Sequence, residues 1–181
     1  MELIQRLVDK IDRFTEATGL AVRWLGLMVM LITVAVVVLR YGFNIGWIAM
    51  QESVLYLHTT VFMLAMGYTL KHDGHVRVDV FYRQFSRRRK AWVDLLGTLL
   101  LLMPVCFFIG FVSWDYVVSS WELTEGSREA GGLPGVFLVK ALIIIMVGTL
   151  LLQGASEALK NVMVILGADL EASTESEERQ P

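Results

Sequence analysis

Four long stretches of the chain carry almost no charged side chains, and polar segments separate them. Each stretch is about as long as a helix must be to cross ~30 Å of hydrocarbon. Residues 53–70 of the second stretch are interrupted only by His58, and residues 133–152 of the fourth only by Lys140. The pattern predicts an all-α integral membrane protein with four transmembrane helices. The predicted spans are 22–43, 47–70, 93–114 and 133–156.

The N-terminal segment shows a different pattern, in which apolar residues recur with helical spacing. Ile4, Leu7, Val8, Ile11 and Phe14 share one side, and charged residues occupy the other faces. We therefore expect residues 1–20 to form an amphipathic helix at the inner membrane interface, separate from the first span.

Two further polar segments differ in charge. Residues 71–92 form a basic connector that contains a short run of apolar residues with helical spacing. These residues are Val78, Phe81, Tyr82 and Phe85. The connector is therefore either a second interfacial helix or a solvated basic loop. The tail, 168–181, is acidic, small and polar, which predicts disorder.

Lysine and arginine lie mostly on one side of the predicted membrane. Of the 16 basic residues, 13 lie in the N-terminal segment through Arg23, between the second and third spans, or after the fourth span. Two fall in the opposite segments, and Lys140 lies within the fourth span. Because cytoplasmic loops carry an excess of lysine and arginine, we expect both termini and the connector 71–92 in the cytoplasm.

The composition excludes several classes of protein. With 55% hydrophobic and 19% charged residues the chain is too apolar for a soluble domain, and nothing indicates a nucleic-acid partner. The single cysteine, Cys106, excludes an intramolecular disulfide and a cysteine-based zinc site. Because the spans offer only His58, Lys140 and flanking carboxylates, we expect no enzymatic activity, cofactor or metal.

Two ionisable side chains at membrane depth imply a partner or a water path. Glu52 lies about one turn into the second span, and Lys140 about two turns into the fourth, both from the outer side. We hypothesise that they form an ion pair. Alternatively, Lys140 snorkels to the outer interface and Glu52 is an exposed interfacial carboxylate. A lone intramembrane histidine such as His58 more often packs against a neighbouring hydroxyl or carbonyl.

The segment 115–132 carries four carboxylates against one arginine, together with tryptophan and tyrosine residues typical of a membrane interface. Its glycines suggest a defined backbone shape, and its net charge is negative. These two features make it a candidate docking site for a soluble protein outside the membrane. The residues proposed for this dock are Glu122, Glu125 and Glu129. The alternative is a plain connector.

Several short motifs occur in a fixed order along the chain. They are Arg40-Tyr41-Gly42-Phe43-Asn44, Trp47 with Gln51-Glu52, Gly67-Tyr68-Thr69-Leu70, Asp73-Gly74-His75-Val76-Arg77-Val78-Asp79-Val80, and Asp94-Leu95-Leu96-Gly97. In this order they resemble the small membrane subunit, of DctQ type, of tripartite ATP-independent periplasmic (TRAP) transporters. The resemblance covers about residues 23–160, and its most specific part is residues 74–80.

This resemblance implies a non-catalytic scaffold subunit in the bacterial inner membrane, with 115–132 as a periplasmic loop. The implied partners are phospholipid, a large DctM-like permease subunit, and a periplasmic substrate-binding protein. The large subunit would move an organic acid with sodium by an elevator motion. The residues expected to make structural or partner contacts are Arg40, Trp47, Glu52, His75, Arg77, Asp79 and Lys140.

A second hypothesis belongs to a different class of protein. The chain would be a haem-binding membrane anchor of a redox enzyme, with His58 as an iron ligand. Such a site usually needs two imidazoles at similar depth on different helices. His72 and His75, however, lie together beyond the inner end of the second span.

Overall fold

The computed structural model describes residues 2–76 and 82–167, and these residues are almost entirely helical. The elements are α1 (Glu2–Gly42), α2 (Ile48–Lys71), α4 (Arg87–Gly97), a π-helical turn η1 (Thr98–Leu102), α5 (Met103–Glu122) and α6 (Val136–Leu166). Because α4, η1 and α5 follow one another without a break, four helical segments are long and apolar enough to cross a membrane. The prediction of an all-α membrane protein with four spans is confirmed.

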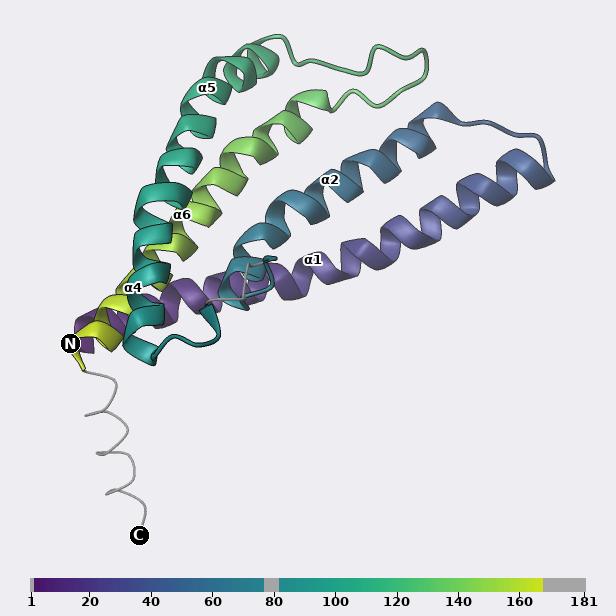
Figure 1. The fold of residues 1–181 in the computed structure, drawn as a ribbon. Helices are drawn as coiled ribbons and strands as arrows, with labels where there is room; N and C mark the ends of the chain where they lie inside the picture. Colours follow the sequence, from purple (N-terminus) through teal and green to yellow (C-terminus); the bar gives the residue numbers. More distant parts are fainter. Residues whose placement is uncertain (1, 77–81, 168–181) are drawn as a thin grey trace.

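The four segments lie side by side in the order α1, α2, α6, α5 (Figure 1). The turns of the α1–α2 and α5–α6 hairpins lie at one end, called here the outer end. The start of α1, the end of α6 and α4 lie at the opposite, inner end. Within the described residues, α5 makes no comparable contact with α1 or α2. The fold is therefore a layer centred on α6 instead of a closed four-helix bundle.

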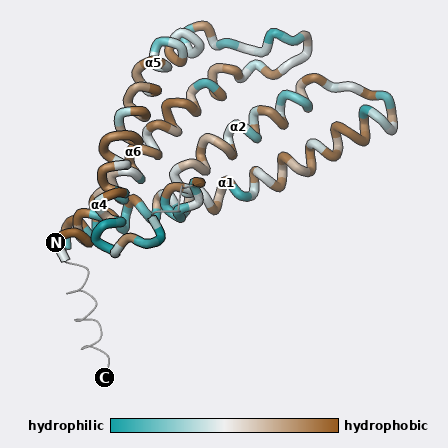
Figure 2. The backbone as a smooth tube through the Cα atoms, viewed as in Figure 1, coloured by the Kyte–Doolittle hydropathy of each residue, from teal (hydrophilic) through white to brown (hydrophobic). Residues whose placement is uncertain are grey.

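An open layer buries few of its side chains. Its core is a small cluster in which α5 and α6 meet, formed by Cys106, Met146, Val147 and Leu150. Elsewhere many large apolar side chains are exposed. They lie on helices that are hydrophobic along much of their length (Figure 2). Phe111 is 84% exposed and Leu31 is 57% exposed. These surfaces need lipid or another protein to cover them.

No break separates the predicted N-terminal interfacial segment from the first span, because α1 is one unbroken helix of 41 residues. Its amphipathic side is also divided: Val8 is buried against the protein, whereas Leu7 and Phe14 are about half exposed. The reason is that no proline or capping signal interrupts the helix near residue 20.

Two other boundaries differ from the sequence prediction. The third span begins at Arg87, so the basic connector 71–92 includes the first turn of that helix. Pro104 follows the π-helical turn, in which the Met103 N–H bonds the Thr98 carbonyl five residues back. This wider turn accommodates a proline that cannot donate a hydrogen bond. The fourth span begins at Val136, so Pro134 precedes the helix instead of lying in its first turn. The helix extends to Leu166. The acidic tail and part of the possible second interfacial helix lie outside the described residues.

A buried polar network joins the inner half of α1 to α6. Gln153 is fully buried, accepts a hydrogen bond from the Thr15 hydroxyl at 2.7 Å, and donates to Asp12 at 3.1 Å and Glu157 at 2.9 Å. The Ser156 hydroxyl, also fully buried, donates to Asp12 at 2.8 Å. Because buried polar groups are costly unless paired, these bonds fix one relative position of the two helices.

Ion pairs surround this network. Lys160 lies 2.7 Å from the Asp12 carboxylate, so the charge on α1 is neutralised from α6. One turn further along α1, Glu16 accepts hydrogen bonds from Lys71 at 2.5 Å and from His72 at 2.9 Å. The inner end of α1 is therefore attached both to α6 and to the end of α2.

Gly19 allows α1 and α2 to approach each other closely. A Cβ atom at this position would lie 2.1 Å from the Tyr68 ring, which means that the ring occupies the space a side chain would fill. Tyr68 in turn contacts the His72 ring, with a centroid distance of 4.3 Å. Close approach through a glycine is a common way for membrane helices to pack.

We expect Gln153→Ala to destabilise the protein by about 2 kcal/mol, because it leaves the buried Thr15 hydroxyl without its partner and removes one of the hydrogen bonds to Asp12. Thermal unfolding in detergent measures the effect. Gln5→Ala is the control for loss of a glutamine side chain, since Gln5 is exposed on α1, the helix that Gln153 bonds from α6. Equal unfolding temperatures for the two variants would mean that the network does not hold the helices together.

We expect Gly19→Ala to destabilise by about 1–3 kcal/mol, because the added methyl group overlaps the Tyr68 ring. Gly26→Ala is the control on the same helix, where an added Cβ meets nothing within 4 Å. Its higher helix propensity should leave stability unchanged or raise it by up to about 1 kcal/mol. If Gly19→Ala were as stable as Gly26→Ala, the α1–α2 contact would be looser than the structure shows.

Candidate partner-binding sites

The loop between α5 and α6 folds back onto the outer ends of the helices. The Glu125 N–H donates to the Ser120 carbonyl at 3.0 Å, and the Phe137 N–H donates to the Glu125 carbonyl at 3.2 Å. Further along, the Ser127 N–H donates to the Leu133 carbonyl at 3.0 Å. These backbone bonds give the loop a defined shape, so it is more than a plain connector.

Lys140 is paired with a carboxylate of this loop. Its ammonium group donates to Glu125 and lies 3.9 Å from the centre of the Tyr116 ring. The Ser120 hydroxyl donates to the same Glu125 oxygen at 2.7 Å. The hydrogen bonds from Lys140 and Ser120 hold the pKa of Glu125 below its ordinary value, since they favour the charged form.

Glu52 is also held by the loop, but at a different place. One carboxylate oxygen accepts a hydrogen bond from the Ser127 hydroxyl, and the other accepts the Leu133 N–H at 2.6 Å. A Cβ atom at Gly132 would lie 2.7 Å from the Glu52 carboxylate, so only glycine leaves room for this contact. Glu52 thereby ties the outer end of α2 to the α5–α6 loop.

The predicted ion pair between Glu52 and Lys140 is wrong, although both residues are paired. The folded loop lies between α2 and α6 and supplies a separate partner to each, Ser127 to Glu52 and Glu125 to Lys140. Sequence spacing placed both side chains near the outer end but did not reveal that the loop turns inward. The glycines and the serine of the loop were the sequence features that could have indicated this inward turn.

The prediction of an exposed three-carboxylate dock is wrong for one of its members. Glu125 points inward to Lys140 and is only 29% exposed, so its charge is neutralised. Glu122 and Glu129 are exposed and remain candidates for contact with a soluble protein.

The other predicted contact residues are scattered over both ends of the layer. Arg40 and Trp47 are exposed at the outer end, on either side of the α1–α2 turn, and His75 is exposed at the inner end. Arg77 and Asp79 lie outside the described residues. The described members of this set do not come together into one site.

His58 lies midway along α2 and is exposed. The structure gives it no hydrogen-bond partner among residues 2–76 and 82–167, so the expected packing against a hydroxyl or carbonyl is not seen. His72 lies about 20 Å further along the chain at roughly 1.5 Å per residue, bonded to Glu16. The two histidines are therefore at different depths, which does not suit a bis-histidine haem site.

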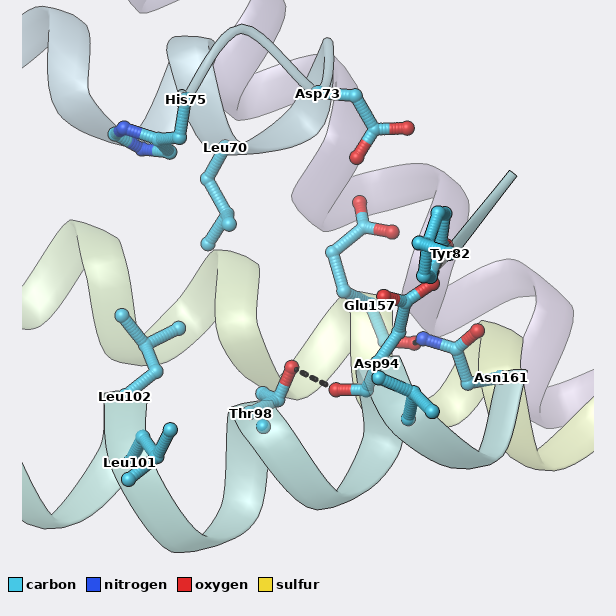
Figure 3. A pocket seen from close by; sticks show the side chains of 12 residues that line it. Leu70, Asp73, His75, Tyr82, Asp94, Thr98, Leu101, Leu102, Glu157 and Asn161 are labelled. Carbon is cyan, nitrogen blue, oxygen red and sulfur yellow. Dashed lines mark hydrogen bonds between the residues drawn. The ribbon is translucent and has the colours of Figure 1, made fainter. Parts of the chain in front are cut away.

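A hollow of about 630 Å³ opens at the inner end, between the end of α2, the α4–η1 segment and α6 (Figure 3). Several carboxylates line it, including Asp94 and Glu157. Asp94 accepts a hydrogen bond from the Tyr82 hydroxyl at 2.5 Å, and Glu157 bonds Gln153 of the inner network. Among the described residues no group of acidic, histidine or cysteine side chains is arranged to hold a metal ion. The Tyr82 bond ties the segment before α4 to that helix, whereas the Glu157 bond to Gln153 lies within α6.

The lowered pKa of Glu125 predicts a pH-dependent contribution to stability. The contribution is complete above the ordinary pKa of 4.5 and is lost as the pH falls through the lowered value. Glu125→Gln should therefore lower the unfolding temperature at neutral pH, and its difference from the unsubstituted protein should shrink in acid. Glu129→Gln, on the exposed part of the same loop, should show neither effect. A pH-independent difference for Glu125→Gln would contradict the ion pair.

Comparison with known proteins gives one match. No curated protein and no solved structure shows significant similarity to the chain. The family described as "Tripartite ATP-independent periplasmic transporters, DctQ component" matches residues 29–163, which include all of α2, α4, η1 and α5, most of α6 and the C-terminal part of α1. Since the match covers well over half of the sequence, this chain belongs to the DctQ component family of the tripartite ATP-independent periplasmic transporters.

Proposed function

We propose that the protein is the fixed scaffold that supports the large, DctM-like permease subunit of a TRAP transporter. The observation that carries this proposal is the use of polar groups inside the layer. Gln153, Asp12, Glu52 and Lys140 all bond other parts of the same chain, so they hold helices instead of converging on a substrate. The family assignment gives no support to the haem-anchor alternative.

The open layer also suits a scaffold. A carrier domain that moves through the bilayer needs a partner that does not move with it. A wide layer with apolar side chains on both of its faces offers a large surface to lipid and to a neighbouring subunit. The exposed Arg88 and Arg89, with Trp92 nearby, add a basic and aromatic band suited to phospholipid headgroups.

The orientation and the outer partner are part of the same proposal. The excess of basic residues in the inner segments supports cytoplasmic termini in a bacterial inner membrane. The α5–α6 loop would then face the periplasm, where exposed Glu122 and Glu129 attract a substrate-binding protein that delivers an organic acid. Sodium is the proposed coupling ion, as implied by the resemblance to the family.

Reconstituted vesicles test the proposal directly. With the large subunit, the binding protein and its organic acid present, omitting this chain should abolish sodium-driven uptake. His58→Ala and Lys140→Met should leave the apparent substrate affinity unchanged, because neither residue belongs to a substrate site. An altered substrate selectivity in either variant would contradict a purely supporting role.

The same components also test the proposed docking of the binding protein on the α5–α6 loop. Neutralising Glu122 and Glu129 together should slow association with the binding protein, most clearly at low salt, where charges are weakly screened. Glu125→Gln is the matched control, since its charge is already paired. Equal rates for all variants across a salt series would remove the loop from the proposed dock.

A further inference from the structure

One face of α2 stands out because it combines polar groups with exposure at membrane depth. Beyond Ile48 in the first turn, the exposed residues of α2 are Gln51, Leu55, His58 and Phe62, which follow one another at intervals of four, three and four positions. This spacing places them in a single line along the helix. The rest of α2 is covered at least partly by α1 and α6.

The depth of His58 makes this line unusual. The helix α2 has 24 residues, and His58 lies about 15 Å from its outer end at roughly 1.5 Å per residue. An imidazole there would sit near the middle of the hydrocarbon, where an unpaired polar group is costly. Within the described part of the chain no side chain or carbonyl bonds it, so lipid alone would leave it unsatisfied.

Other exposed surfaces of the layer lack this feature. On α1 the exposed residues at similar depth include Leu31 and Val34, and on α5 they include Phe107 and Phe111, all of them apolar. Such surfaces suit lipid tails. The line on α2 therefore differs from its neighbours in requiring a hydrogen-bonding partner within the membrane.

We propose that the line Gln51, Leu55, His58 and Phe62 is the seat of a transmembrane helix of the large permease subunit, which hydrogen-bonds His58. The inference rests on the proposed function, because that function supplies a second membrane protein beside this layer. A single exposed line at helical spacing matches the seam that one packed helix occupies. Leu55 and Phe62, 60% and 57% exposed, provide the apolar contacts on either side of the histidine.

Photo-crosslinking in membranes tests the location of this helix. A benzoylphenylalanine residue at position 55 or 62 should give an adduct with the mass of this chain plus the large subunit. The same probe at Phe111 or Leu31, which are equally open, should not. Adducts from Phe111 or Leu31 but not from α2, an adduct of two copies of this chain, or lipid adducts alone would each overturn the proposal.

Substitution of His58 tests the hydrogen bond. His58→Leu should lower the yield of large subunit that co-purifies in detergent several-fold, whereas His58→Gln, which can still bond, should restore most of it. Phe111→Leu is the control for a changed apolar surface. The unfolding temperature of each isolated variant should match that of the unsubstituted chain, because His58 bonds nothing among residues 2–76 and 82–167. Full co-purification of His58→Leu would overturn the proposed bond.

Co-purification and crosslinking distinguish a wrong function from a wrong α2 surface. If the unsubstituted chain did not co-purify with the large subunit at all, the proposed function itself would be wrong. If it co-purified but all crosslinks came from α1, α5 or α6, the function would stand and the assignment of the α2 face would be wrong.

Discussion

The arrangement of the layer depends on the buried hydrogen bonds and ion pairs between the inner half of α1 and α6. Gln153 and Ser156 are fully enclosed, so they require Asp12 and Thr15 at one fixed position. Hydrocarbon exerts no hydrophobic preference among apolar helix faces, which means that apolar packing alone would allow α1 to slide or rotate. The polar network removes that freedom, and Gly19 then brings α2 against the fixed helix.

A second set of polar contacts does the same at the outer end. There the α5–α6 loop bonds Glu52 of α2 and Lys140 of α6, so that α2, α5 and α6 share one connection. Between the two ends the helices make mainly apolar contacts and leave much of their surface open. The protein is thus held at its two membrane boundaries, while its middle remains available to neighbours.

The sequence was sufficient for the features that depend on local pattern, and insufficient for those that depend on tertiary partners. An uncharged apolar stretch of this length indicates a transmembrane helix, so the four spans were predictable. The polar face of the first 20 residues allowed two interpretations. Its charged residues could face water at the membrane interface or bond another helix, and in the structure Asp12 bonds α6. Depth along a helix was predictable for Glu52 and Lys140, but the inward turn of the loop that supplies their partners was not. Gln153 gave no signal, since a single glutamine near the end of a span resembles a solvated residue.

The continuity of α1 has a mechanical consequence. A helix of 41 residues is about 61 Å long, roughly twice the hydrocarbon thickness of a bilayer. Because no break interrupts it between Glu2 and Gly42, the helix would tilt as one rigid rod about the Gly19 contact near its midpoint. A small tilt imposed at the outer turn would displace the inner end by a comparable distance and strain the bonds of Asp12. The two membrane surfaces are in this way rigidly linked through a single element.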